Sequence, residues 1–180
     1  MRGVCGSTED DLHRAILLKQ VHGKRIAENP SGGEEADGMV VRRGAGFPAL
    51  RLADCASLFL WSDDWLGAVH AGWRGLAAGA VAALVRSFPG EPVLALSGPC
   101  ICSGCYEAGE DVRTAVMESC GGIHPPGRLD LAEALRNQAV SAGLRCPILS
   151  PGWCTRCRPD LFHSYRRDGT AARNIVILEG

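Results

Sequence analysis

Short apolar or alternating segments, separated by Gly, Pro and Asp, occupy much of the first half of the chain. Apolar residues that recur with a period of two predict β-strands, and the turn-forming residues between them mark where each strand ends. The pattern predicts strands at residues 15–21, 38–43, 48–54, 57–62 and 65–71, and later at 92–98, 146–150 and 174–179.

The hydrophobic period becomes helical in three places. Apolar residues at 77, 80, 81, 84, 85 and 88 predict a helix over 76–88, which Pro89 and Gly90 end. Similar spacing predicts helices over 107–120 and 129–144. Because the strands gather before the first helix and do not alternate regularly with helices, we expect an α+β fold. Its predicted architecture is a layered sandwich of β-sheets flanked by helices, rather than a doubly wound parallel sheet.

Length and charge narrow the class of protein. With 180 residues, 46% of them hydrophobic, and no internal repeat, the chain predicts a single domain over 1–180. A net charge of −1 without a basic tail gives no reason to expect a nucleic-acid partner. The polar start is unlike a signal peptide and the apolar runs are too short for a membrane span, so we expect a cytoplasmic protein that binds no membrane. A monomer is favoured.

Candidate chemistry begins at "AVHAGWRG", where His70 ends a predicted strand and small residues leave one face of its ring open. Taken alone, His70 is better explained as a buried histidine held by a hydrogen bond. Cys105 precedes a predicted helix, where the helix dipole would stabilise a thiolate, and His124 lies in a proline-bound loop after that helix. Two imidazoles and one thiolate leave a fourth tetrahedral position open, the pattern of a catalytic zinc.

The nine cysteines leave other metal sites open. A first group of Cys100, Cys102 and Cys105, with Cys154 and Cys157, could supply four thiolates to a structural zinc or an iron–sulfur cluster. This alternative ranks second because the first group runs directly into a predicted helix. A dithiol redox pair at 154–157 ranks lower, because such a motif normally follows an early strand and opens a helix.

Further polar residues lie where strands end. His22 leaves a predicted strand in "QVHG", and Arg51 and Asp54 could face a cleft together, although an Asp-capped turn is about as good an explanation. Arg166 lies in "SYRRDGTAARN", whose guanidinium groups suit phosphate oxygens, with a solvated loop as the ordinary alternative.

Seven segments together resemble one known family. They are QVHG, ADGMV, ADC, HAGWRG, GPCICSGCYEAGEDV, LDL and WCTRCRPDLFHSYRRDGTAARN, which fall in family order from Gln20 to Asn174. The chain is similar to the polyphenol oxidase or laccase-domain family, many of whose members are regarded as zinc-dependent purine nucleoside phosphorylases with adenosine deaminase activity. The resemblance implies a compact sandwich of sheets and helices, and a metal bound by His70, Cys105 and His124.

The implied reaction is phosphorolysis of adenosine, inosine or methylthioadenosine to the free base and ribose 1-phosphate, with adenosine deamination beside it. Purine nucleoside and phosphate are then the partners, and zinc is favoured over copper because five histidines are too few for several copper sites. Arg51, Arg74 or Arg166 would hold phosphate, and His22 or Asp54 would handle protons.

Two alternatives and two departures accompany this interpretation. Cys105 could instead be the nucleophile of a cysteine hydrolase with His124 as its base, or the chain could bind zinc and nucleoside without turnover. The family's usual arginine- and asparagine-containing opening segment is missing before QVHG. In addition, Ala56 and Ser57 replace a common proline.

Overall fold

The computed structural model describes residues 13–122 and 126–179, and its strands form two sheets. The order in the larger sheet is β2 (Ile26–Glu28), β3 (Gly38–Arg42), β6 (Trp65–Ala71), β5 (Ala56–Trp61), β7 (Leu94–Ser97) and β8 (Ile148–Leu149). The smaller sheet has the order β1 (Ala15–Leu17), β4 (Phe47–Leu52) and β9 (Asn174–Ile177). Both sheets are mixed, since β2–β3, β7–β8 and β1–β4 are parallel pairs and the other pairs are antiparallel.

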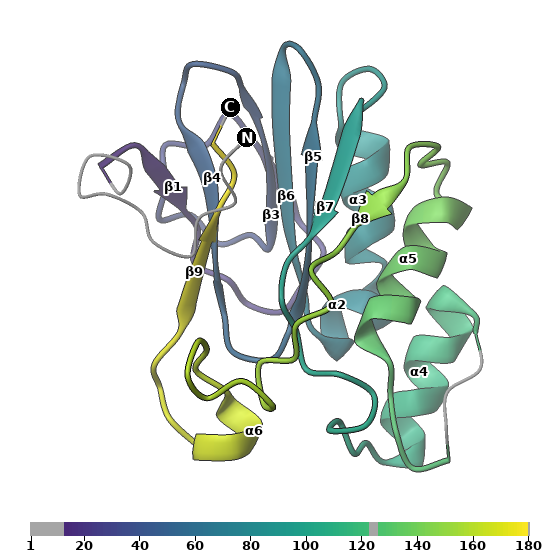
Figure 1. Cartoon of the computed structure of the whole chain (residues 1–180). Coiled ribbons are helices and arrows are strands. Elements are labelled where there is room, and N and C mark those ends of the chain that lie inside the picture. Colours follow the sequence, from purple (N-terminus) through teal and green to yellow (C-terminus); the bar gives the residue numbers. More distant parts are fainter. Residues whose placement is uncertain (1–12, 123–125, 180) are drawn as a thin grey trace.

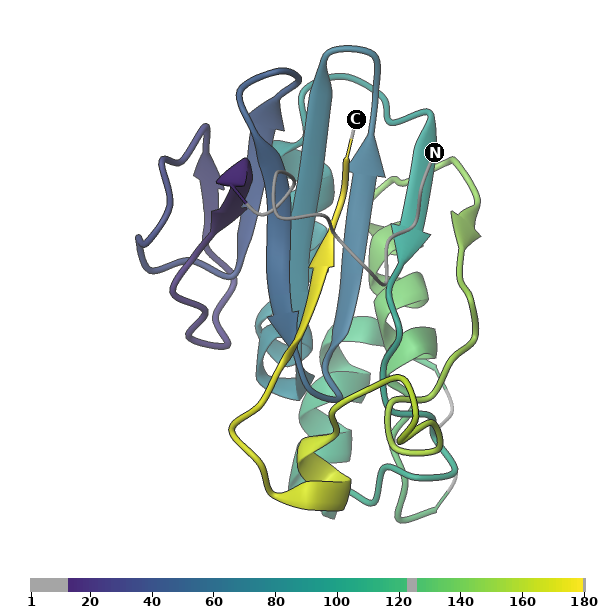
Figure 2. The ribbon, with the colours of Figure 1, turned by 60° about the vertical axis from the view of Figure 1, so that its left-hand side comes forward.

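Helices cover one face of the larger sheet and the smaller sheet covers the other (Figures 1 and 2). The covering helices are α2 (Trp73–Ala78), α3 (Ala80–Ser87), α4 (Glu110–Cys120) and α5 (Leu131–Ser141). The short α6 (Tyr165–Asp168) lies near the start of β9, at the bottom of the view in Figure 1. The predicted α+β fold of sheets and helices is confirmed.

The alternation of side chains along β5 and β6 divides the core in two. Leu58, Leu60 and Val69 pack with the helices, whereas Phe59 and Ala68 pack with the smaller sheet. Side chains two residues apart on a strand share a face. His70 therefore points to the same side as Ala68, toward the smaller sheet and away from the helices.

The predicted helix over 76–88 is two helices. Gly79 has a left-handed backbone with φ 88°, and its N–H bonds to the carbonyls of Gly75 and Leu76, which ends α2. Glycine offers no side chain to cap α3, and Gln138 of α5 supplies the acceptor instead. Its Oε1 accepts from the N–H groups of Val81 at 3.0 Å and Ala82 at 3.3 Å.

The helices predicted over 107–120 and 129–144 both begin a few residues later in the structure, as α4 and α5. The residues before α4 form a turn instead, in which the N–H of Tyr106 donates to the carbonyl of Cys102 at 3.1 Å. The helix α4 therefore begins only at Glu110. Asp130 accepts a hydrogen bond from the N–H of Glu133 and so fixes the start of α5 at the next residue.

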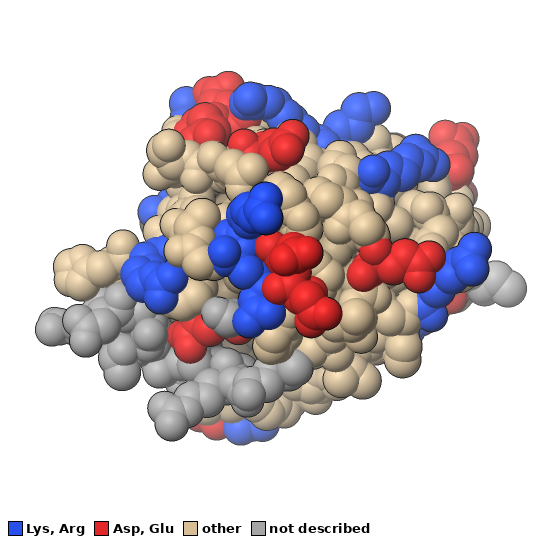
Figure 3. Space-filling model, turned by 90° about the horizontal axis from the view of Figure 1, so that it is seen from above, with Lys and Arg blue, Asp and Glu red and all other residues tan. Residues whose placement is uncertain are grey.

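Most predicted strands agree with the structure within a few residues. The predicted strands 15–21 and 146–150 shorten to β1 and β8, and the sequence analysis missed the short β2 and α6. In the described part of the chain, no helix has the length and apolarity needed to cross a membrane. The face seen from above carries basic and acidic side chains in small mixed groups (Figure 3).

Candidate functional site

The site is built around a buried carboxylate–imidazole pair. The antiparallel pairing of β3 with β6 places Asp37, just before β3, beside His70 at the end of β6. The His70 N–H donates to the Asp37 carbonyl at 2.7 Å, and His70 Nδ1 lies 2.8 Å from Asp37 Oδ1. Since Nδ1 is engaged by Asp37, Nε2 is the nitrogen left for other partners.

The same carboxylate also holds the QVHG turn. Asp37 accepts hydrogen bonds from the backbone N–H groups of Val21 at 3.2 Å, His22 at 2.8 Å and Gly23 at 2.6 Å. These bonds fix His22 in a left-handed backbone conformation with φ 61°. One buried aspartate therefore positions both histidines of the site.

His22, Cys55 and His70 come together around a small space. The two imidazole rings meet edge to face at 4.7 Å between centroids, and one ligand atom from each of the three residues lies within 4.8 Å of the others. Gly72 keeps this space open, because a Cβ there would lie 2.9 Å from Cys55 Sγ and 3.2 Å from His22 Cδ2. The glycine of HAGWRG is therefore required by the site.

Electrostatics favour the charged forms of Cys55, His70 and Asp37. Burial would raise the pKa of Cys55, but hydrogen bonds with His22 and His70 lower it to about 7. Burial would lower the pKa of His70, but Asp37 and Cys55 raise it to about 9. For Asp37, burial is opposed by the hydrogen bonds from His70 and Gly23, and its pKa stays below the ordinary value.

The group opens into a cavity of about 600 Å³. That volume falls within the range of about 300–1,000 Å³ found for small-ligand sites. Two guanidinium groups, those of Arg51 and Arg173, take part in its wall, where they favour an anionic ligand. The lining residues are Leu18, Lys19, Gln20, His22, Arg51, Ala53, Cys55, His70, Tyr165 and Arg173.

Two of the predicted catalytic and substrate-binding residues, His22 and Arg51, line this cavity. The side chain of Gln20 fixes the backbone at Arg51: its Nε2 donates to the Arg51 carbonyl at 3.0 Å and its Oε1 accepts from the Arg51 N–H at 2.8 Å.

The other predicted polar residues lie elsewhere. Asp54 is buried, with Oδ1 accepting from Thr155 Oγ1 at 2.6 Å and Oδ2 from the Arg166 N–H at 2.7 Å, so its carboxylate ties distant segments together. The guanidinium of Arg166 lies over the Tyr106 ring, and that of Arg74 over the Trp73 ring. None of the three predicted residues lines the cavity.

Cys105 lies in a different group from His70. Its neighbours are the thiols of Cys102, Cys154 and Cys157, and the hydrogen bond with Cys157 raises its pKa. The expectation that a helix dipole stabilises a Cys105 thiolate was wrong, because α4 begins only at Glu110. His124 lies outside the described residues, so the triad of His70, Cys105 and His124 stays a prediction.

Sequence reasoning missed Asp37, Cys55 and Arg173 as site residues. Asp37 precedes a buried strand in ADGMV, and Cys55 follows Asp54 at a strand end, so the polar strand-end rule that found His22 could have found both. The imidazoles of His22 and His70 and the thiol of Cys55 are nitrogen and sulfur donors, which suit zinc. A carboxylate bonded to the far nitrogen of a ligating histidine, as Asp37 is to His70, is a common support for such a ligand.

Comparison with known proteins places these features in one family. The family model described as "Multi-copper polyphenol oxidoreductase laccase" matches residues 2–178. "Purine nucleoside phosphorylase" of Aquifex aeolicus is 35% identical over 72% of this chain and 65% of its own length. "Purine nucleoside phosphorylase YfiH" of Escherichia coli is 30% identical over 89% of this chain and 71% of its own length.

Solved structures agree with this assignment. Hypothetical protein YfiH of Bacillus licheniformis is 27% identical with a TM-score of 0.81, covering 92% of this chain and 73% of that chain. YlmD of Geobacillus stearothermophilus is 29% identical with the same TM-score and the same coverage. The chain thus spans about two thirds to three quarters of the relatives it matches. By sequence and by fold, it belongs to the multi-copper polyphenol oxidoreductase laccase family.

Proposed function

We propose that this protein is a purine nucleoside phosphorylase whose substrates bind in the cavity at His22. One observation carries the proposal. A single cavity of about 600 Å³ is lined both by the group of His22, Cys55 and His70 and by two arginines, Arg51 and Arg173. The name of the relatives, purine nucleoside phosphorylase, supports the same reaction. Adenosine, inosine and methylthioadenosine are the proposed nucleosides.

The cationic side chains in the cavity wall are the proposed binding groups for phosphate. Arg51 and Arg173 both line the cavity, and Lys19 lines it as well, although its charge is offset by Glu35 at 2.7 Å. The side chain of Gln20 fixes the backbone of Arg51, which limits the positions open to its guanidinium. Arg51 is therefore a better candidate for phosphate than Arg74 or Arg166, whose guanidinium groups lie over aromatic rings outside the cavity.

In phosphorolysis a phosphate oxygen attacks the anomeric carbon of the ribose. The bond from that carbon to the purine breaks, its electron pair goes to the base, and a proton must reach the departing purine. His22 lines the cavity and is held by its backbone to Asp37, so it is placed to donate that proton. Asp54 is less suited to proton transfer, because both of its carboxylate oxygens already accept hydrogen bonds.

Zinc is part of the proposal, with His22, Cys55 and His70 as the donors that lie together. When bound, zinc supplies a Lewis acid that lowers the pKa of bound water, the chemistry required for adenosine deamination. His22 then serves as a ligand rather than as a proton donor. The zinc content of a His22→Ala variant separates these roles, since a ligand's removal lowers zinc and a proton donor's removal lowers only turnover.

The direct test uses the full chain purified without chelator. Adenosine, inosine and methylthioadenosine are incubated with and without phosphate, and free base, ribose 1-phosphate and inosine are quantified by chromatography. We expect base release that requires phosphate and falls at least about tenfold in Arg51→Ala, as for loss of about 1.4 kcal/mol of transition-state binding. Arg145→Ala, an exposed arginine outside the cavity, is the matched control. Base release that does not depend on phosphate, or no base release at all, contradicts the proposal.

One observation favours a second candidate function. Cys55 lies between two imidazoles, one of them oriented by Asp37, which is the arrangement of a cysteine nucleophile with its base. In this version of the cysteine hydrolase, Cys55 replaces Cys105 as the nucleophile. Hydrolysis that resists chelators and is abolished by iodoacetamide labelling of Cys55 supports it. Stabilisation by purine nucleosides in a thermal-shift assay, with no product, indicates a binding protein instead.

A further inference from the structure

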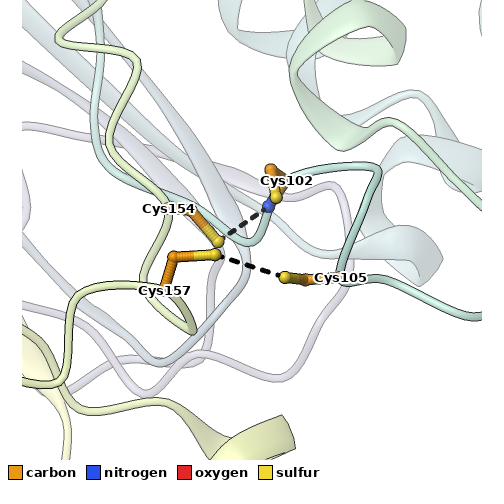
Figure 4. A group of neighbouring side chains, drawn as sticks. All are labelled: Cys102, Cys105, Cys154 and Cys157. Atoms are coloured by element: carbon orange, nitrogen blue, oxygen red, sulfur yellow. Dashed lines mark hydrogen bonds between the residues drawn. The ribbon is translucent and has the colours of Figure 1, made fainter.

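We infer that Cys102, Cys105, Cys154 and Cys157 form a separate metal site that holds a structural zinc ion. The four side chains converge from two loops that are distant in sequence (Figure 4). One loop joins β7 to α4, and the other follows β8. The inference depends on these thiols alone and not on the proposed reaction.

Each loop presents its two thiols in the same way. The spacing is C-x-x-C in both, and each turn is closed by backbone bonds: the N–H of Cys105 to the carbonyl of Cys102 at 2.9 Å, and that of Arg158 to the carbonyl of Cys154 at 3.2 Å. In addition, the N–H of Cys102 donates to Cys154 Sγ at 3.3 Å. Paired knuckles of this kind supply the four ligands of structural zinc sites.

The two knuckles are held against each other by main-chain contacts. Cys100 and Cys154 form a parallel bridge, in which the N–H of Cys100 donates to the Trp153 carbonyl at 3.3 Å and the N–H of Thr155 to the Cys100 carbonyl at 3.2 Å. The backbone therefore sets the convergence of the thiols and would keep it without an ion.

The distances fit a single ion. All four sulfurs lie within 4.8 Å of one another, and those of Cys105 and Cys157 are 3.4 Å apart (Figure 4). A zinc–sulfur bond of about 2.3 Å in a tetrahedron puts neighbouring sulfurs about 3.8 Å apart. A disulfide needs about 2.0 Å, and an iron–sulfur cluster places several atoms between its ligands and so spreads them. The spacing favours one tetrahedral ion over both alternatives.

Four thiolates repel one another unless a cation lies between them. Positively charged side chains near the site also reduce this repulsion. Two guanidinium groups are bonded to the first knuckle: Arg156 to the Cys105 carbonyl at 3.2 Å, and Arg128 to the Gly104 carbonyl. Arg156 brings positive charge to the net negative charge that remains when a divalent ion binds four thiolates, whereas the charge of Arg128 is shared with Glu107 at 3.5 Å.

The site is placed to stabilise the cavity wall. Thr155, beside Cys154, donates to Asp54, and Asp54 accepts from the Arg166 N–H at the start of α6. The neighbouring Tyr165 lines the cavity. An ion at the four thiols therefore fixes the segment that carries this wall, without contacting substrate.

The test measures zinc by mass spectrometry and its ligands by X-ray absorption on the purified full chain. Of the zinc bound to the full chain, we expect one ion per chain to have four sulfur neighbours at about 2.3 Å. Cys102→Ser and Cys157→Ser, which change exposed side chains, should each lose this zinc, whereas Cys146→Ser, a half-buried thiol outside the group, should keep it. His70→Ala should keep the all-sulfur zinc as well, which separates this site from the cavity.

Several results overturn the inference. They are zinc whose only ligands are nitrogen and oxygen, iron with acid-labile sulfide, disulfides between these cysteines in freshly purified protein, or unchanged sulfur-bound zinc in both serine variants. Because none of these measurements involves turnover, absence of phosphorolysis leaves the inference standing, and loss of the thiol site leaves the proposed reaction open.

Discussion

Replacing Asp37 with asparagine tests the central arrangement of the site. Asp37 is fully buried, and each of its two carboxylate oxygens has two hydrogen-bond partners. Oδ1 accepts from the His22 N–H and faces His70 Nδ1, and Oδ2 accepts from the Val21 and Gly23 N–H groups. An asparagine amide has one oxygen and one NH2 group. In either orientation its NH2 therefore faces two groups that donate to Asp37, of which only His70 Nδ1 could become an acceptor, by moving its proton to Nε2.

The structure allows the cost to be worked out. A hydrogen bond to a charged group contributes about 1.5–3 kcal/mol, and two such bonds are lost. Because three of the four donors belong to a turn that can reach water, the lower limit applies, and Asp37→Asn should lower the free energy of unfolding by about 3 kcal/mol. Against a total of about 5–15 kcal/mol, that is a large fraction of the stability.

Urea denaturation of the full chain measures this change. With a slope of about 2 kcal/mol/M, the midpoint should fall by about 1.5 M. Asp63→Asn is the matched control, because this exposed aspartate contributes only its backbone carbonyl to a hydrogen bond, with Arg43, and should leave the midpoint within about 0.3 M. A loss below about 1 kcal/mol in Asp37→Asn would refute the claim that this carboxylate organises both histidines.

Three further variants or conditions test other parts of the structure. Gly72→Ala should lower zinc content and turnover together, because its Cβ would meet Cys55 Sγ and His22 Cδ2; unchanged zinc content would contradict this role of the glycine. Gln138→Leu should destabilise the protein by about 2–3 kcal/mol in thermal or urea unfolding, since it leaves one buried and one half-buried N–H group of α3 without this acceptor. A neutral result would be inconsistent with that role. In metal-free protein, iodoacetamide labelling of Cys55 should reach half its maximal rate near pH 7, because the lowered pKa makes the thiolate form as the pH rises through that value; a midpoint near 9 would show that the imidazoles do not act on this thiol.

The sequence predicted the fold where the hydrophobic pattern was strong. β3 to β7 follow alternating or fully apolar runs bounded by turn residues, and the structure places them where the pattern does. It failed where a backbone bond rather than a pattern decides the element. The left-handed Gly79 divides one apolar helix into two, and the three-residue β2 has no periodicity to detect.

The site was predictable only in part, for a related reason. Position at the end of a predicted strand identified His22 and His70, since that property is local in sequence. The assignment of cysteines to groups is not local. Cys105 faces Cys157, 52 residues away, because a main-chain bridge joins two loops, and nothing in the spacing distinguishes that from a partnership with His70.

The cavity also has a consequence for the order of folding. Its wall draws on residues from Leu18 to Arg173, and β4 pairs with β9 across more than a hundred positions of chain. Contacts between such distant segments close large loops and form late, whereas the hairpin of β5 and β6 can form early. During synthesis on the ribosome, the cavity should therefore be completed only after the β9 segment has emerged, when the core of the larger sheet already exists.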